Sequence, residues 1–589
     1  MQLVRFLLAI LVLNLILGAC TEETVSVVTP EQPTPQHTQA AVNGTPASAT
    51  EITTPANFKP DREFIFGLSQ EPVAFMRTSP NDPSTGIGLD PANLVDQPSL
   101  IIVRQIFDTL FEFKPGSMQY QYASLLKPDG FYISEDGLTY TIRIGGGLVF
   151  SDGTPLDAES LRWNFIRWSN PNSVYHKGDF STYRNFFVDL PGYPGYPGIL
   201  DMDRLEVPNS RTLVVHLKAP MPNFFQVLSM PQFAIVSQSS FDKEGNFIKP
   251  VGSGAYMVDK PYDRRAKLEQ RYMTLKKNPN YSVEKDPNML PARAIETIVL
   301  KVLPGNQDGL RALRSGEISA TDKIKPEDVT ANLNDPIFEI KHRLALNIAF
   351  LGINQTRAPF DLIEVRQALA YGINTAALVG KYYQGLGTIA SGFLPPSALS
   401  FRSDLKSYPY DPQKARDLLA QVGYINGITT PIDLWVIPVS RLYYPDPGKI
   451  AQAIVDDLAK INIKIVLHEE SSWVNFNPHR DDGRYTLYMG GWQGENGDPE
   501  EFLFRFFGEE RKDLGYNNPV VRKWLKVARN ENNLVNRRPL YSQVTDQLLS
   551  DIPLLPLAYV DWPVAVRRDI NGYEPSPNGI ENWAYLSFN

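Results

Sequence analysis

The chain has 589 residues, of which 43% are hydrophobic and 21% charged, and its formal net charge at pH 7 is −8. This length exceeds what one hydrophobic core usually organises, so we expect two or more lobes. The negative charge argues against nucleic-acid binding, because proteins that bind phosphates present clustered Lys and Arg, and the sequence has no such cluster. The single cysteine excludes a disulfide within the chain.

The first apolar stretch ends at that cysteine. Residues 6–17 are almost all apolar and follow Arg5, as in a secretory signal, and the stretch is shorter than the roughly 20 residues of a membrane-spanning helix. Small residues then precede Cys20. We therefore predict a lipoprotein signal peptide over residues 1–19 and lipidation of Cys20, which would anchor an exported chain to the cell-envelope membrane, facing the periplasm or the outside. The alternative is an ordinary signal peptide that ends near a cysteine.

The segment after the cysteine is rich in Thr, Pro, Ala and Glu and has no apolar periodicity. Such a composition cannot bury enough apolar surface to offset the entropy of ordering. Residues 20–58 are therefore predicted to be a disordered spacer between the anchor and the folded body.

The first half of the folded body is predicted to consist mainly of strands. Residues 64–68 predict a buried first strand, and residues 138–144 alternate apolar and polar side chains with the period of a strand. Turn sequences at 134–137 and 151–153 flank the second strand, which favours a β-meander. A helix is expected to begin at Asp157. Further strands are predicted at 212–217 and 297–303.

The second half of the chain has a different pattern, with helices at 363–370 and 412–422 and a helix at 450–458 followed by a strand at 463–467. A helix followed by a strand is the building step of an α/β lobe, so we expect an open, mostly parallel sheet here.

Motifs of catalysis and metal binding are incomplete. Residues 468–472 read His-Glu-Glu-Ser-Ser and lack the second histidine of a zinc-protease helix. Residues 251–254 read Val-Gly-Ser-Gly and lack the glycine two positions before the serine of a nucleophile elbow. The sequence has no Walker-type phosphate loop. We predict no catalytic residue, metal or cofactor, and a secreted hydrolase or a structural surface protein remains the alternative class.

Four stretches of the chain together resemble the bacterial extracellular solute-binding proteins of family 5, which serve peptide and nickel ABC importers. They occur in the family's order, at residues 128–163, 250–281, 354–369 and 410–424. The resemblance implies an α/β fold of two domains that close like a clamshell on a ligand between them. It places domain I at residues 59–340 plus 551–589, with an extra sub-lobe at about 95–245, and domain II at 341–550.

The most specific stretch is residues 491–499, Gly-Trp-Gln-Gly-Glu-Asn-Gly-Asp-Pro. It is most similar to the dipeptide-binding branch, in which an aspartate at the position of Glu495 pairs with the peptide's α-ammonium group. In the same branch an arginine at the position of Arg441 pairs with the α-carboxylate. The resemblance thus implies ligand-binding roles for a set of six residues: Glu495, Arg441, Trp492, Gly494, Asn496 and Tyr443.

Physical chemistry supports this pair of charges. A zwitterionic peptide sealed in a cleft takes two charges out of water, and each costs several kcal/mol unless it is paired. The planar fork of an arginine suits a carboxylate, and an acidic residue suits an ammonium group. Glu495 is one methylene longer than the usual aspartate, which leaves the ligand open. The alternative roles are a solvated turn for Glu495, a surface ion pair for Arg441 and core packing for Trp492.

The function implied by the resemblance is that of the substrate-binding component of an ABC importer. The chain would capture short peptides, from dipeptides to oligopeptides, outside the membrane and deliver them to the permease as a monomer, without catalysis. A nickel chelate, an oligosaccharide or another solute is the alternative ligand within the same fold.

Overall fold

Two large β-sheets organise the chain in the computed structural model, which describes residues 63–76, 85–86, 88–123, 125–189, 195–267, 270–281, 295–305 and 307–589. These residues all belong to one compact unit, Pro55–Asn589. The predicted signal peptide, the lipidation site Cys20 and the spacer 20–58 lie outside the described residues. None of the described helices is long and apolar enough to cross a bilayer.

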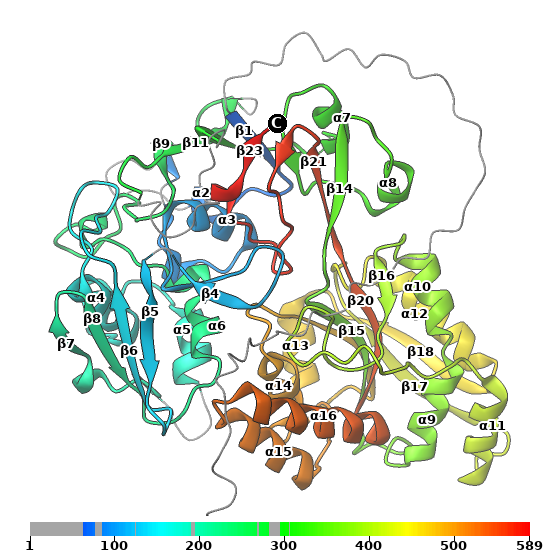
Figure 1. The fold of residues 1–589 in the computed structure, drawn as a ribbon. Helices are drawn as coiled ribbons and strands as arrows, with labels where there is room; N and C mark the ends of the chain where they lie inside the picture. Colours follow the sequence, from blue (N-terminus) through cyan, green and yellow to red (C-terminus); the bar gives the residue numbers. More distant parts are fainter. Residues whose placement is uncertain are drawn as a thin grey trace, which may run out of the picture. The chain divides into compact units, whose positions relative to one another are not determined.

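The first large sheet has seven strands, with β1 near its centre (Figure 1). β1 pairs in parallel with β12 and β13, and the other strand pairs are antiparallel. In sheet order the strands are β14 (Phe338–Arg343), β21 (Trp562–Arg567), β13 (Ala320–Thr321), β1 (Glu63–Leu68), β12 (Thr297–Val302), β11 (Tyr272–Lys277) and β9 (Tyr256–Lys260). The strands predicted at 64–68 and 297–303 are confirmed. Phe64 and Phe66 pack their rings on Trp583 in the core beneath this sheet.

A smaller sheet of four antiparallel strands belongs to the first half of the chain. Its order is β5 (Leu126–Ile133), β6 (Thr139–Ile144), β8 (Thr212–His216) and β7 (Glu206–Asn209). The predicted strands 138–144 and 212–217 are therefore confirmed, but the β-meander is wrong. β5 and β6 form a hairpin, whereas β6 next pairs with β8, because the chain leaves the sheet after β6 to form α4 (Ala158–Ser169). Asp157 caps α4 by accepting the backbone N–H of Ser160, as expected for a helix beginning there.

The first half of the chain also contains shorter helices, and the described residues form three two-stranded pairs. The helices are α2 (Val73–Met76), α3 (Gln97–Ile106), α5 (Ser181–Tyr183), α6 (Phe224–Leu228), α7 (Gly309–Arg314) and α8 (Pro326–Ala331), and the π-helical turn η2 (Arg184–Val188) follows α5. Two-stranded pairs join β3 (Phe111–Phe113) to β4 (Tyr120–Tyr122), β10 (Tyr262–Asp263) to β2 (Thr85–Gly86), and β22 (Ile570–Asn571) to β23 (Ser587–Phe588).

The second large sheet has six strands and mixed directions. Its order is β16 (Gly387–Ile389), β20 (Leu554–Val560), β15 (Asn347–Ile353), β19 (Leu487–Gln493), β17 (Ile428–Val436) and β18 (Ile463–Glu469). Only the pairs β17–β18 and β17–β19 are parallel, so the expectation of a mostly parallel sheet is wrong. The chain enters this sheet along β15 and leaves it along β20, and these neighbouring strands therefore run in opposite directions.

Helices pack around the six-stranded sheet, with α12 against β17 and β18 and α15 against α16 (Figure 1). They are α9 (Ile363–Gly372), α10 (Thr375–Tyr382), α11 (Pro412–Gln421), α12 (Pro447–Ala459), α13 (Trp473–Asp481), α14 (Leu503–Phe507), α15 (Pro519–Arg529) and α16 (Leu534–Asp551). The helices and the strand predicted here are confirmed. α11 and α12 each begin with a capping aspartate, Asp411 or Asp446, followed by proline at the first helical position, where a missing N–H is tolerated.

The chain passes between the two large sheets twice, and the two crossings are hydrogen-bonded to each other. The side chain of Asn347 donates to the Val560 carbonyl at 2.7 Å and accepts from the Val560 N–H at 3.1 Å. The Ala345 N–H donates to the Asp561 carboxylate at 2.9 Å. Just before the first crossing, the fully buried Arg343 forms a bidentate ion pair with Glu581.

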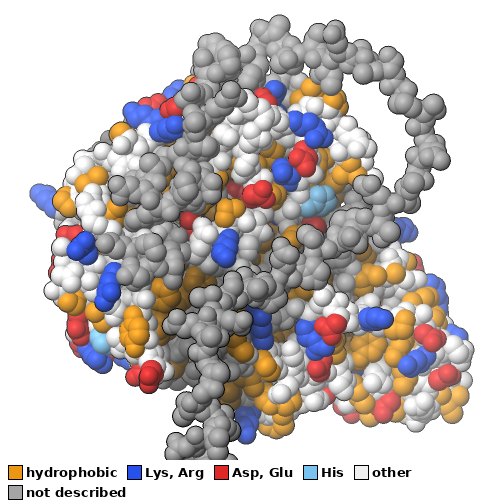
Figure 2. All heavy atoms as spheres, viewed as in Figure 1, with side chains coloured by type: hydrophobic (Ala, Val, Ile, Leu, Met, Phe, Trp, Pro, Cys, Tyr) orange, Lys and Arg blue, Asp and Glu red, His pale blue; other side chains and the backbone are white. Residues whose placement is uncertain are grey.

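The surface carries both signs of charge. On the face drawn in Figure 2, Lys and Arg side chains of the described residues are interspersed with Asp and Glu side chains rather than gathered together. This face therefore offers no concentrated positive charge to a nucleic acid.

Candidate functional site

The loop that follows β19 is held in place by one carboxylate. Glu501 is buried, and its two oxygens accept the backbone N–H groups of Glu495 at 2.9 Å, of Asn496 at 3.0 Å and of Gly497 at 3.0 Å. Burial and the neighbouring Glu495 raise the pKa of Glu501 to about 8, against the effect of these three donors. The Glu501 carboxylate thus accepts hydrogen bonds from three successive backbone N–H groups of the loop, which fixes the path of the loop.

A buried ion pair fastens the same loop to α16. Arg537 donates two hydrogen bonds to Asp498, at 2.9 Å and 3.0 Å, and the two side chains are 2% and 0% exposed. Arg537 also donates to the Tyr541 hydroxyl at 2.7 Å. The bidentate geometry restrains both the distance and the orientation of the loop relative to the helix.

The restrained loop presents Glu495 to a cavity of about 300 Å³, which we call the Glu495 cavity. One wall comes from the chain around η2 and before α6, including Phe186, Asp189 and Met221; the other includes Trp492, Glu495, Phe504 and Arg505. Residues about 300 positions apart in the sequence therefore face each other across this cavity. The first half of the chain forms one wall, and the second half forms the other.

Glu495 differs from the other acidic residues that line this cavity. Glu500 pairs with Arg529 at 2.7 Å, Asp189 lies 3.5 Å from Arg184, and Glu501 is engaged by the loop. The Glu495 carboxylate has no hydrogen bond or ion pair among the described residues, and the residue is exposed to the cavity. The walls of the cavity partly desolvate the carboxylate, which raises the pKa of Glu495, and the positive charge of Arg505 partly offsets this.

Arg505 stands between the Glu495 cavity and a second cavity. It belongs to α14, and its guanidinium carbon lies 3.7 Å from the centre of the Trp492 ring. A cation held this close over an indole face is attracted by the ring's electron density. Arg505 and Trp492 line both cavities. Burial, followed by the like charges of Arg511 and Arg480, lowers the pKa of Arg505.

The second cavity has a volume of about 640 Å³ and is called here the arginine cavity. Its lining includes three arginines, Arg441, Arg480 and Arg505, and four aromatic residues, Tyr443, Trp473, Phe476 and Trp492. The Arg441 guanidinium carbon lies 5.3 Å from the centre of the Trp473 ring, and Arg441 is exposed. Oppositely charged side chains thus line two cavities that share one wall.

The structure brings four of the six predicted site residues to these cavities. Glu495 lines the first cavity, Arg441 and Tyr443 line the second, and Trp492 lines both. Gly494 and Asn496 are buried inside the loop and line neither cavity.

Gly494 and Asn496 have roles in the shape of the loop. The Gly494 N–H donates to the Leu346 carbonyl at 2.8 Å, and a Cβ at Gly494 would lie 2.7 Å from the Phe502 ring. The Asn496 side chain accepts the Asp498 N–H at 2.9 Å.

Sequence reasoning missed Arg505, Arg480 and the opposite wall of the Glu495 cavity. Arg505 is the one cation in the apolar run Leu503–Phe507, and such an isolated charge could have drawn attention to it. The opposite wall carries no comparable signal, because its cavity-lining residues at 220–223 are Pro, Met, Pro and Asn.

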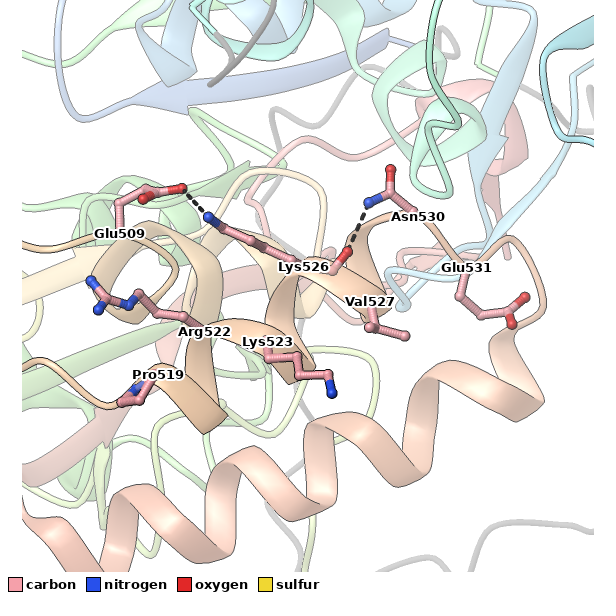
Figure 3. Close-up of a pocket in the computed structure, with 8 residues that line it drawn as sticks. All are labelled: Glu509, Pro519, Arg522, Lys523, Lys526, Val527, Asn530 and Glu531. Atoms are coloured by element: carbon pink, nitrogen blue, oxygen red, sulfur yellow. Dashed lines mark hydrogen bonds and ion pairs between the residues drawn. The ribbon is translucent and has the colours of Figure 1, made fainter.

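A larger hollow of about 780 Å³ lies along α15, and one ion pair, Lys526 with Glu509, joins two of the residues that line it. Figure 3 shows Lys526 extended toward Glu509, with an N–O distance of 3.2 Å, and Asn530 donating to the Lys526 carbonyl at 2.8 Å. The two cavities around Arg505 are the stronger candidate for a ligand site, because they bring together a carboxylate and two guanidinium groups that have no ion pair among the described residues.

Comparison with known proteins fits this arrangement. The family model described as "Bacterial extracellular solute-binding proteins, family 5 Middle" matches residues 123–513. The chain belongs to this family. Family 5 proteins bind solutes outside the cell membrane, so the two cavities lie in a chain of a solute-binding family rather than an enzyme family.

Two curated relatives in family 5 match most of the chain. Heme-binding protein A of Haemophilus influenzae is 29% identical over 517 residues, covering 84% of this chain and 89% of the relative. The dipeptide-binding protein of Escherichia coli is 28% identical over 505 residues, covering 82% and 89%.

Solved structures of family 5 relatives share the fold. HbpA2 from Haemophilus parasuis superposes with a TM-score of 0.77 at 25% identity, covering 90% of this chain and 100% of that one. The dipeptide-binding protein of Pseudoalteromonas sp. SM9913, in complex with Met-Leu, gives a TM-score of 0.65 at 21% identity, covering 90% and 100%. The expected α/β, two-domain, periplasmic-binding-protein-like fold is confirmed.

Proposed function

We propose that the chain captures short peptides between its two halves and delivers them to an ABC permease. The observation that carries this proposal is a set of opposite charges without an ion pair among the described residues: Glu495 in one cavity, and Arg441 with Arg505 in the adjoining one. Glu495 would receive the peptide's α-ammonium group and Arg441 its α-carboxylate. Trp492 and Tyr443 would form the apolar walls between them.

The names of the relatives support a peptide ligand. Four matched proteins are named dipeptide- or di/tripeptide-binding proteins, and each is matched over at least 80% of this chain. The charges of the site also support a peptide ligand, because a peptide of any sequence has one ammonium group and one carboxylate group at its ends.

The test is calorimetry of the purified full-length protein, kept in detergent, with di-, tri- and tetrapeptides. We expect binding by the parent protein, and a loss of affinity of about tenfold or more in both Glu495→Gln and Arg441→Ala. Each variant removes one charged hydrogen-bonding partner, which corresponds to roughly 1.5–3 kcal/mol.

Glu469→Gln is the matched control, because Glu469 is an exposed glutamate at the end of β18 and lines neither cavity. Its peptide affinity is expected to equal that of the parent. Absence of heat with every peptide, or unchanged affinity in the two site variants, would exclude the peptide assignment. Cleavage of the peptides during the titration would favour a hydrolase instead.

The affinity is also expected to depend on pH. The carboxylate form of Glu495 attracts an ammonium group and the protonated form does not. Because burial raises the pKa of Glu495 above the ordinary 4.5, affinity begins to fall at a higher pH than for an ordinary glutamate as the solution is acidified. Calorimetry from about pH 7 down to about pH 5, a range in which the peptide's amino group stays charged, measures this fall.

Glu495→Gln removes the titration of this residue and, because the charge of Glu495 contributes to the raised pKa of Glu501, also lowers the pKa of Glu501 from about 8. The variant is expected to show a flatter dependence of affinity on pH. Equal slopes in the parent and the variant would assign the titration to another group.

We further propose the domain limits implied by the resemblance, with domain I at 59–340 plus 551–589 and domain II at 341–550. Two strands extend past these limits, because β14 (Phe338–Arg343) belongs to the seven-stranded sheet and β20 (Leu554–Val560) belongs to the six-stranded sheet. Lipidation of Cys20 and action as a monomer beside the membrane belong to the same proposal. Cys20→Ala should release the protein from the membrane fraction of the cells that produce it, and retention there would contradict the anchor.

Heme is a second candidate ligand, because a relative that matches 84% of this chain is named a heme-binding protein and the arginine cavity combines aromatic walls with cations. An absorbance titration separates the two candidates. A saturable shift of the heme absorption band that dipeptides do not displace would favour heme over peptides.

A further inference from the structure

The arginine cavity carries more positive charge than one carboxylate requires. Arg441, Arg480 and Arg505 line it, and the described residues that line it include no Asp or Glu. Arg441 comes from the chain before α12, Arg480 from α13 and Arg505 from α14, so three separate segments direct a cation to the same space.

These three guanidinium groups differ in their partners. Arg480 pairs with its neighbour Asp481 at 2.8 Å. Arg441 and Arg505 form no ion pair or side-chain hydrogen bond with any residue that the structure describes. Each instead lies against an indole ring, Arg441 near Trp473 and Arg505 over Trp492. Stacking of this kind holds the plane of a guanidinium group and leaves its N–H edge available to an anion.

A zwitterionic peptide with uncharged side chains cannot pair with all the charged groups of this site. A peptide with neutral side chains supplies one ammonium group for Glu495 and one carboxylate for either Arg441 or Arg505. The remaining guanidinium group would stay without an anion in a cleft from which the ligand displaces water, which is unfavourable. A ligand with a second carboxylate removes that imbalance.

We propose that the site selects short peptides whose carboxyl-terminal residue has an acidic side chain, so that two neighbouring carboxylates meet Arg441 and Arg505. This inference rests on the proposed peptide function and names the ligand class within it. Arg505 is the residue that determines the specificity, since it stands between the two cavities and reaches both the acidic and the basic part of the site.

The experiment compares Ala-Glu with Ala-Gln, which has nearly the same shape without the charge, in calorimetry of the full-length protein. We expect the parent to bind Ala-Glu about tenfold more tightly, a difference of about 1.4 kcal/mol. In Arg505→Met, which keeps an apolar stem over Trp492, the ratio of the two affinities is expected to fall to about one. A thermal melt of the variant verifies that it is folded.

Arg484→Met is the matched control, because Arg484 is an exposed arginine that pairs with Asp482 and lines neither cavity. It should keep the parent ratio. Equal affinity of the parent for Ala-Glu and Ala-Gln would overturn the inference, as would an unchanged ratio in Arg505→Met. Glu-Ala binding as tightly as Ala-Glu would overturn the assignment to the carboxyl-terminal residue. Failure of all three peptides to bind would contradict the proposed function itself.

Discussion

Asp498→Asn is expected to destabilise the protein by about 3–5 kcal/mol and to weaken ligand binding at the same time. The substitution leaves the shape of the side chain nearly unchanged but removes the charge that pairs with Arg537, whose side chain is 2% exposed. Arg537 would then be a buried cation without an anion. The loop that presents Glu495 loses its fastening to α16, so the site loosens together with the fold.

Thermal and urea melts followed by tryptophan fluorescence measure this effect. Asp482→Asn is the control, because Asp482 and its partner Arg484 are 55% and 60% exposed and such surface pairs contribute less than about 1 kcal/mol. A double variant, Asp498→Leu with Arg537→Met, should recover part of the loss, because apolar residues can replace a buried ion pair. Recovery stays incomplete, since Asp498 also accepts the Glu500 N–H at 3.0 Å. A melting temperature for Asp498→Asn within one degree of the parent would contradict the argument.

Gly254→Ala is expected to be comparably damaging, for a steric reason. A Cβ at Gly254 would lie 2.6–2.8 Å from the backbone carbonyl groups of Gln105 and Ile106 at the end of α3. Backbone atoms cannot rotate away as a side chain can, so the segment must separate from the helix. The separation breaks the hydrogen bond from the Gly254 N–H to the Ile106 carbonyl, which is 2.9 Å long. We expect a loss of about 3 kcal/mol or more, at the upper end of the overpacking range.

Gly380→Ala is expected to stabilise the protein, in contrast to Gly254→Ala. Gly380 lies inside α10, and a Cβ there would meet no atom within 4 Å. Alanine in an exposed helical position stabilises by up to about 1 kcal/mol relative to glycine. Thermal melts of the two variants should therefore move in opposite directions. Equal melting temperatures would show that the contact at Gly254 is not constraining.

Local patterns in the sequence were sufficient for most individual elements. The alternation in β6, the start of α4 at Asp157 and the apolar face of α12 each depend on residues within one turn or one strand. Strand neighbours depend on distant pairing instead. The meander around β6 and the parallel character of the six-stranded sheet were therefore predicted wrongly.

The same distinction applies to the site. Glu495, Trp492, Arg441 and Tyr443 occur in stretches that resemble the dipeptide-binding branch, and the structure places all four at the cavities. Arg505 acquires its significance only from its stacking on Trp492 and from the absence of an ion pair with any described carboxylate. No local pattern encodes either property. Small and polar residues occur both in tightly packed loops and in loops that bind a ligand. For this reason the sequence alone suggests that Gly494 and Asn496 contact a ligand.

The two hydrogen-bonded crossings between the sheets have a mechanical consequence. A single connecting strand would permit the two halves to twist, slide and bend independently. Two adjacent connections, joined through Asn347 to Val560 and through Asp561 to Ala345, resist twisting and sliding and leave bending as the soft motion. Glu495 and the wall around Phe186 therefore approach along one path. Because most of the rotational freedom of the halves is already removed before a ligand arrives, less entropy is lost when they close around it.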